Sequence, residues 1–117
     1  MKYPVEQIRS FCEQVWEKAG LSHEDAVSCV NVLLAADMRG QRTHGTTHMK
    51  DYCDRMLNGT VSNGSDIEIK PTSPSTLVVV AKHSVGMVTG VIVMAKCIEQ
   101  AKTSGSCFAS VHNGCHY

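Results

Sequence analysis

The fold is decided by residues 76 to 111, which read TLVVVAKHSVGMVTGVIVMAKCIEQAKTSGSCFASV. Residues 76–81 are rich in β-branched side chains, which predicts a strand covered on both faces of a sheet. Residues 85–102 have the length and apolar pattern of a helix closed by Ser104-Gly105, and residues 107–111 form a second short strand. Strand, helix and strand make one βαβ unit, so we expect its two strands to be parallel.

The segment before this unit, residues 60–75, is rich in Ser, Thr, Asn, Gly and Pro. It reads as a connector in which only Ile67-Glu68-Ile69 alternates like a short edge strand. A parallel sheet of two strands would leave both of its edges bare. The βαβ unit is therefore expected to be the front portion of a larger α/β fold.

Residues 1–59 read as a three-helix segment. Apolar residues recur at spacings of three and four in each predicted helix. Ser22, with Asp25 three residues later, forms a shortened capping box at the start of the second helix. The three helices are predicted after Pro4 up to Gly20, from Ser22 to about Arg39-Gly40, and from Met49 to Asn58-Gly59.

Composition limits the kinds of partner. The chain has 117 residues, 43% of them apolar, with 11 Lys and Arg against 11 Asp and Glu, as in a small soluble globular protein. Formal neutrality and the lack of a Lys/Arg cluster argue against nucleic acid and anionic membranes. The longest apolar stretch, residues 85–97, is shorter than the roughly 20 residues that span a bilayer. Glu6, Arg9 and Glu13 interrupt any secretory signal, which favours a cytoplasmic location.

Six cysteines raise the possibility of a disulfide framework. Four of them, however, fall within helix-like patterns at or beside core-facing positions, where a free Cys behaves as a small hydrophobe. These four are Cys12, Cys29, Cys53 and Cys97. We therefore expect reduced thiols.

Two polar stretches, residues 39–48 and 112–117, contain four of the six histidines. An imidazole exchanges a proton near neutral pH, so a His held beside a hydroxyl can act as a general acid or base. Thr43 beside His44, followed by Gly45, has this form. The alternative is that His44 caps the following helix or is simply solvated.

Three other kinds of site are weighed and disfavoured. A zinc site is conceivable from its residue types at two places, His44 with His48 and His112-x-x-Cys115-His116. Neither place shows the two short-spaced pairs of ligands that Cys/His zinc sites usually have, so no metal is expected. The pair Gly86-x-x-x-Gly90 lacks the residues of a phosphate loop and is expected to permit helix packing. A thiol nucleophile at Cys115 is disfavoured because adjacent residues on a turn seldom face each other.

Three motifs in this order resemble the type 2 malate/L-lactate dehydrogenase family. They are Asp37-x-Arg39-Gly40-x-x-Thr43-His44-Gly45, Tyr52-x-x-Arg55-x-x-x-Gly59, and Asn113-x-x-His116 followed by Tyr117. The resemblance covers essentially the whole chain. It implies an α/β NAD(P)-dependent dehydrogenase fold unrelated to the Rossmann domain, in a family that includes sulfolactate, ureidoglycolate and diketogulonate dehydrogenases and a cyclic-imine reductase.

The resemblance also implies roles for individual residues. His44 is expected to be a proton donor or acceptor in the active site, with Thr43 orienting it where the family usually has Ser. His116 matches a pocket histidine and is a second candidate for proton transfer. The implied cofactor is NAD or NADP, the substrate a small 2-hydroxy or 2-oxo acid, and the full-length protein a homodimer.

Several positions depart from the family pattern. His48, at a substrate-binding position, stands where the family commonly has Arg, and an imidazole cannot grip a carboxylate through two parallel bonds as a guanidinium does. His112, Gly114 and Cys115 replace what is usually Arg, Ser and Asn. The family's nucleotide-binding loops match no residue up to Tyr117, so cofactor-binding residues are unassigned.

Two hypotheses follow. The first is an oxidoreductase of the malate/L-lactate type represented by its N-terminal portion, with residues 76–117 as the start of an incomplete catalytic domain after the connector 60–75. The second is a truncated or degenerate relative that binds no cofactor and acts at most as an interaction module.

Overall fold

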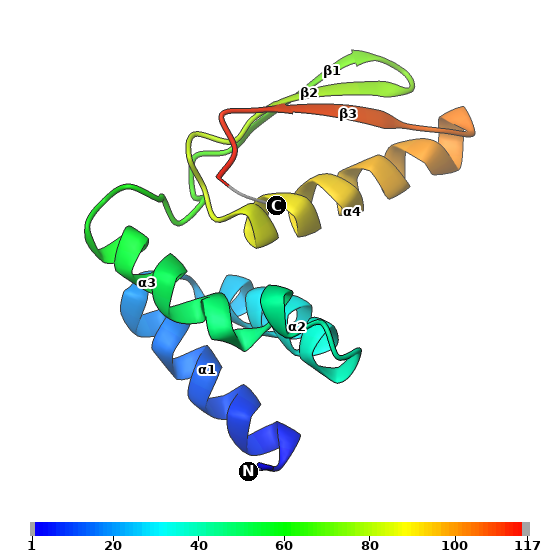
Figure 1. Ribbon diagram of the computed structural model, residues 1–117. Coiled ribbons are helices and arrows are strands. Elements are labelled where there is room, and N and C mark those ends of the chain that lie inside the picture. Colours follow the sequence, from blue (N-terminus) through cyan, green and yellow to red (C-terminus); the bar gives the residue numbers. More distant parts are fainter. Residues whose placement is uncertain (1, 116–117) are drawn as a thin grey trace. The chain divides into compact units, whose positions relative to one another are not determined.

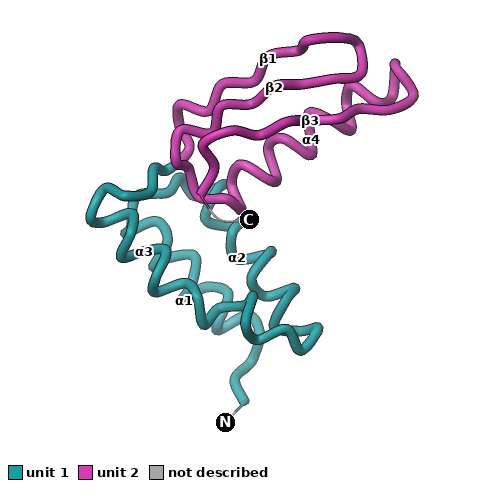
Figure 2. The backbone as a smooth tube through the Cα atoms, turned by 45° about the horizontal axis from the view of Figure 1, so that its top comes forward, with its two compact units in different colours: residues 1–63 teal, residues 64–117 magenta. Residues whose placement is uncertain are grey.

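Three helices form the first compact unit of the chain, residues 1–63 (Figure 2). The computed structural model describes residues 2–115. The helices are α1 (Val5–Ala19), α2 (His23–Met38) and α3 (Met49–Leu57). All three predicted helices are confirmed, and each ends where the sequence indicated. Gly20, with φ +121°, ends α1 in a conformation that an L side chain rarely adopts.

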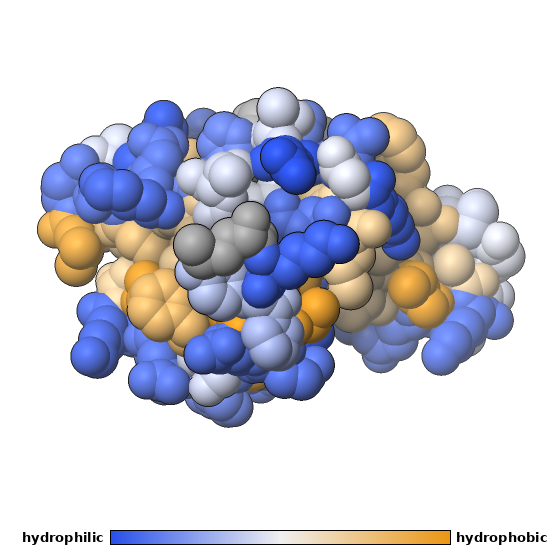
Figure 3. Space-filling model, turned by 60° about the horizontal axis from the view of Figure 1, so that its bottom comes forward, coloured by the Kyte–Doolittle hydropathy of each residue, from blue (hydrophilic) through white to orange (hydrophobic). Residues whose placement is uncertain are grey.

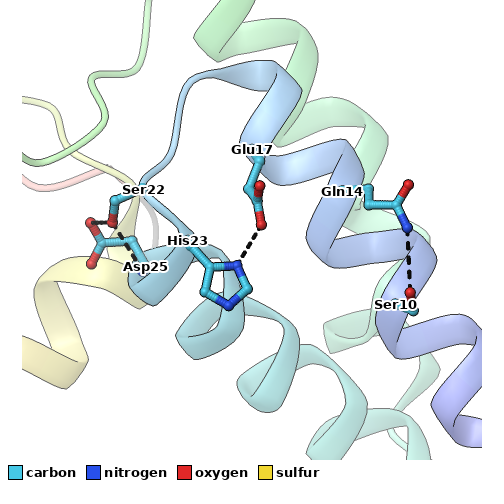
Figure 4. A network of polar contacts seen from close by, with 6 residues as sticks. All are labelled: Ser10, Gln14, Glu17, Ser22, His23 and Asp25. Carbon is cyan, nitrogen blue, oxygen red and sulfur yellow. Dashed lines mark hydrogen bonds and ion pairs between the residues drawn. The ribbon is translucent and has the colours of Figure 1, made fainter.

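The corner between α1 and α2 is held by side-chain contacts (Figure 4). The Ser22 Oγ accepts a hydrogen bond from the Asp25 backbone N–H at 3.1 Å, which caps α2 as predicted. Glu17 Oε1 lies 2.6 Å from His23 Nδ1, joining the end of α1 to the first turn of α2. The hydrogen bond and the charge of Glu17 raise the pKa of His23.

The core of this unit lies between the three helices. Trp16 of α1 is fully buried, and its ring centroid is 6.3 Å from that of Tyr52 on α3. Each helix also contributes one buried free cysteine to the core: Cys12, Cys29 and Cys53. Burial is the main cause that raises the pKa of the Cys29 thiol to about 12. These thiols are small apolar core groups, as expected from their place in the helical pattern.

The second unit, residues 64–117, contains a mixed sheet of three strands and one long helix (Figure 1). Its elements are β1 (Glu68–Ser73), β2 (Thr76–Val80), α4 (Gly86–Ser104) and β3 (Phe108–His112). Strands β2 and β3 are parallel, which confirms the predicted βαβ unit. With the helices of the first unit, this sheet makes the chain a mixed α/β protein.

Strand β1 lies inside the predicted connector, where Ile67-Glu68-Ile69 was expected to alternate like a short edge strand, and it runs on to Ser73. It pairs antiparallel with β2, so β1 is an edge strand and β2 is the central strand. The sequence signal was weak because Pro71 lacks a backbone N–H and the register shifts between Pro71 and Ser73. An edge strand tolerates both features, since only one of its sides pairs with a neighbour.

Strand β2 is buried on one face. Leu77 and Val79 are 1% and 0% exposed, whereas the alternating residues Thr76, Val78 and Val80 are half-buried. Among residues 2–115, the face of β2 that carries Thr76, Val78 and Val80 is only partly covered. The prediction of a strand covered on both faces is therefore wrong for this face. The physical reason is that residues 64–115 form a single helix, α4, which can cover one face of the sheet.

The start of α4 is fixed by a buried pair of hydroxyl groups. Ser84 and Thr89 are both fully buried and hydrogen bond to each other through their side chains. The Thr89 hydroxyl also approaches the Val85 carbonyl oxygen, at 3.3 Å. These contacts satisfy polar groups that would otherwise be buried without partners.

The surface carries scattered apolar groups. On the face drawn in Figure 3, hydrophobic side chains form separate patches between hydrophilic ones. Phe11, Met38 and Leu57 are among the exposed large apolar residues of the first unit. Among the described residues, no helix has the length and apolar character needed to cross a membrane.

Candidate functional site

The Thr43-His44-Gly45 motif lies in a tight bend between α2 and α3. Two short 3-10 helices, η1 (Arg42–His44) and η2 (Thr46–His48), follow one another with Gly45 between them. The His44 backbone N–H donates to the Gln41 carbonyl at 2.9 Å, and the Thr47 hydroxyl donates to the Arg42 carbonyl at 2.7 Å. The bend is thus built from local hydrogen bonds.

Gly45 is needed in this bend for space. Its φ of −101° is open to any residue, but a Cβ atom at this position would lie 1.7 Å from the Asp37 Oδ1 atom and 2.4 Å from the Asp37 Cγ atom. Real side chains do not approach so closely. The group that leaves no room for a side chain at Gly45 is the Asp37 carboxylate.

Asp37, in the last turn of α2, anchors the bend. Its Oδ2 atom accepts two hydrogen bonds from Thr46, one from the backbone N–H at 3.0 Å and one from the hydroxyl at 2.7 Å. Both bonds are partly buried. Hydrogen bonds to a carboxylate are stronger than neutral ones, so this group fixes η2 to the end of α2. Sequence reasoning quoted Asp37 as part of a motif but assigned it no role.

His44 itself is exposed and has one side-chain partner. The Thr43 Oγ1 atom lies 3.0 Å from the His44 Nδ1 atom. Which atom donates depends on the tautomer of the ring. In either case Nδ1 is occupied, and Nε2 has no partner among residues 2–115. The arrangement suits proton exchange at Nε2 with a ring oriented by Thr43.

His48 occupies the position before α3. Its side chain is exposed, and its ring centroid lies 6.4 Å from that of Tyr52, with 57° between the ring planes. The backbone of His48 donates to the Gly45 carbonyl at 3.2 Å, so His44 and His48 flank the same anchored turn. Its substrate-binding role stays a prediction.

The second polar stretch lies at the ends of β2 and β3. The Ala81 N–H donates to the His112 carbonyl at 2.9 Å, and the His83 N–H donates to the Asn113 carbonyl at 2.7 Å. His83, Lys82 and Asn113 have positive φ values of 58°, 49° and 54°. Three non-glycine residues in this conformation at one edge of a sheet mark a tightly constrained turn.

The remaining predicted residues of this stretch have no tested role. The Nε2 atom of His112 lies 3.3 Å from the Ser110 hydroxyl, and Cys115 is half-buried. His116, the second candidate for proton transfer, and Tyr117 lie outside the described residues. The role of His116 in proton transfer stays a prediction.

Gly86 and Gly90 lie within α4, so this pair does not form a phosphate-binding loop. Within residues 2–115, no three His, Cys, Asp or Glu side chains group in a way that could hold a metal ion.

Comparison with known proteins places these features in a wider context. A family model described as malate/L-lactate dehydrogenase matches residues 3–117. The chain is 32% identical to a malate dehydrogenase of Pyrococcus abyssi over 117 residues, which is 100% of this chain and 32% of that protein. It is 28% identical to an NAD(+) ureidoglycolate dehydrogenase of Escherichia coli over 105 residues, 90% of this chain and 30% of that one.

Solved structures agree with the sequence comparison. The malate dehydrogenase of Pyrococcus horikoshii superposes with a TM-score of 0.95 at 30% identity, covering 100% of this chain and 34% of that one. The malate dehydrogenase of Entamoeba histolytica gives a TM-score of 0.91 at 32% identity, covering 99% of this chain and 32% of that one. The chain thus spans about a third of the length of the relatives it matches.

Proposed function

Because the chain belongs to the malate/L-lactate dehydrogenase family, we propose that it supplies the proton-transfer site of an NAD- or NADP-dependent oxidoreductase acting on a small 2-hydroxy acid. The observation that carries the proposal is the anchored bend at residues 42–48, which presents an exposed imidazole oriented by a neighbouring hydroxyl. The family name supplies the reaction class.

In this proposal His44 moves a proton at the substrate hydroxyl. During oxidation its neutral Nε2 accepts that proton, and during reduction the imidazolium returns it to the developing alkoxide. Thr43 holds Nδ1 at 3.0 Å and so orients the ring in both charge states. NAD or NADP supplies hydride chemistry to such enzymes, and the step that we assign to this chain is the proton transfer.

His48 is proposed to face the substrate carboxylate. Protonated, its imidazole can donate a single hydrogen bond to a carboxylate from the same anchored turn that holds His44. This is weaker than the paired bonds of an arginine, so we expect modest affinity for the acid. His116 remains the alternative proton-transfer residue.

The proposal extends to assembly and location. The resemblance implies a homodimer of the full-length protein, and the exposed residues Val91, Met94 and Ile98, spaced as one stripe of α4, are the kind of surface that packs on another polypeptide. A cytoplasmic location is part of the same proposal.

The test is a chimera in which this chain replaces the matching third of the Pyrococcus horikoshii malate dehydrogenase. We expect the folded chimera to oxidise a 2-hydroxy acid with NAD or NADP, and His44→Ala to lower kcat by about 10²- to 10⁴-fold. His23→Gln, which changes an exposed histidine elsewhere in the first unit, is the matched control and should leave kcat unchanged.

Two results would count against the proposal. Unchanged turnover in the His44→Ala chimera would remove His44 from the mechanism and leave His116 as the candidate. A chimera that folds and binds nucleotide but turns over none of a panel of 2-hydroxy acids would favour the interaction-module alternative.

A further inference from the structure

The junction between α4 and β3 brings together two cysteines that have no place in the proposed proton transfer. Cys97 lies on α4, and Cys107 immediately precedes β3. Both are free and half-buried. Their environment therefore differs from that of the three thiols in the core of the first unit.

The helix pattern places Cys97 on the inner side of α4. Residues four apart lie on one face of a helix, so Cys97 continues the row of Val93 and precedes Ala101. Val93 is buried, and Cys97 and Ala101 are half-buried. The outer side of α4, by contrast, carries the exposed Ile98.

The strand pattern places Cys107 on the face of the sheet that α4 covers. Side chains alternate between faces along a strand, so Cys107 shares its face with Ala109. Ala109 pairs with the buried Leu77, whereas Phe108, on the opposite face, is 70% exposed. Helix α4 runs along this sheet in Figure 1.

The length of the connection brings the two cysteines level with each other. From Cys97 to the end of α4 the helix rises by about 10 Å. Gly105, with φ +84°, reverses the chain, and the next residues return by a similar distance of about 10 Å in extended conformation. In agreement with this placement, Cys97 raises the pKa of the Cys107 thiol through a side-chain hydrogen bond and through its charge, after burial as the largest cause.

We propose that Cys97 and Cys107 are a redox-sensitive pair. By exchange with a small disulfide such as oxidised glutathione, they form a reversible disulfide with each other. The bond would tie the last turns of α4 to the start of β3. A disulfide holds its two sulfur atoms about 2 Å apart, and the two side chains lie on the facing sides of α4 and the sheet. Nothing in this proposal depends on the dehydrogenase activity.

The chemistry is thiol–disulfide exchange. One cysteine thiolate attacks a glutathione sulfur, forms a mixed disulfide and releases the first glutathione as a thiolate. The second cysteine thiolate attacks the protein sulfur of the mixed disulfide and releases the second glutathione. The two protons of the protein thiols pass through solvent to the released glutathione thiolates. Two protein thiols are oxidised to one disulfide, and one glutathione disulfide is reduced to two thiols.

The other cysteines provide the contrast. Cys29 is fully buried, and burial is the main cause that raises the pKa of its thiol to about 12. It therefore offers almost no thiolate to an oxidant. Burial, the hydrogen bond and the charge of Cys97 raise the pKa of Cys107 as well. Pairing should therefore speed up as the pH is raised. Cys115, half-buried and in the same unit, is the matched control residue.

The test treats the folded chain with oxidised glutathione and maps the product by mass spectrometry. The chain should lose two hydrogen atoms in mass, a Cys97–Cys107 cross-linked peptide should appear, and dithiothreitol should restore the original mass. Cys97→Ser and Cys107→Ser should each abolish this product and carry a glutathione adduct instead. Cys115→Ser should behave as the unmodified chain.

The proposal fails if the folded chain carries glutathione on Cys97 and Cys107 separately without closing the disulfide. It also fails if the dominant cross-link joins either residue to Cys115. Circular dichroism spectra of the serine variants, matched to that of the unmodified chain, ensure that a lost cross-link reports the missing sulfur rather than unfolding.

Discussion

Replacing Gly45 with alanine is expected to destabilise the first unit through one specific contact. The added methyl group would lie 1.7 Å from Asp37 Oδ1 and 2.9 Å from Oδ2. This neighbour is a carboxylate that is held by two hydrogen bonds, so relief of the clash requires the carboxylate to leave its position. The backbone at Gly45 needs no change, because its φ of −101° suits alanine.

The size of the effect follows from the hydrogen bonds that are lost. Asp37 Oδ2 accepts bonds of 3.0 and 2.7 Å from Thr46, and both are partly buried. Hydrogen bonds to a charged group each contribute about 1.5 kcal/mol at the lower end of their range, which applies because the site is only partly buried. Gly45→Ala should therefore lower the free energy of unfolding by about 3 kcal/mol.

The assay is urea unfolding followed by tryptophan fluorescence. Trp16 is the single tryptophan of the chain, lies in the first unit and is fully buried, so its emission reports the unfolding of this unit. The decisive experiment is a double-mutant cycle with Asp37→Ala, which loses the same two bonds without a clash. Asp37→Asn keeps a side-chain oxygen as acceptor and should be less destabilising than Asp37→Ala.

If the reasoning holds, Gly45→Ala adds little to the destabilisation already caused by Asp37→Ala. The two changes would then be strongly non-additive, because each removes the same pair of hydrogen bonds. Additive effects, with the double variant losing about twice as much as either single variant, would refute the argument. They would mean that Gly45 is required for a reason other than the Asp37 carboxylate.

Three further predictions concern histidines. His48→Arg in the chimera should lower KM for a 2-oxo acid by about tenfold, from steady-state kinetics, because a guanidinium binds a carboxylate through paired charged bonds. The hydrogen bond and the charge of Glu17 raise the pKa of His23 above 6.5. The stability that this pair contributes to the fold is therefore complete below pH 6.5 and is lost as the pH rises through the raised pKa. His23→Gln should flatten this part of the pH profile of urea midpoints. His83, exposed with φ +58°, should accept glycine without loss of stability, whereas His83→Val should lose about 1–2 kcal/mol in urea melts followed by circular dichroism.

The sequence by itself determined the elements whose signals are local. Apolar spacing located the three helices of the first unit, and Ser22 marked the cap of α2. The β-branched run followed by a long helix and a second strand predicted a parallel pair, which β2 and β3 confirm. Each of these signals is contained within a short window of the chain, where backbone preference and periodicity decide the conformation. The ordered motifs also identified the family.

Tertiary structure decided the features that depend on residues meeting across the chain. Strand β1 forms because β2 offers it an edge to pair with, although Pro71 weakens its own signal. Asp37 meets Gly45 and Thr46 only because the chain turns back on the end of α2. Periodicity describes which side of an element is apolar, but not which distant group will touch it. The bend that holds His44 was therefore visible as a motif, while the carboxylate that fixes it became visible only in the folded chain.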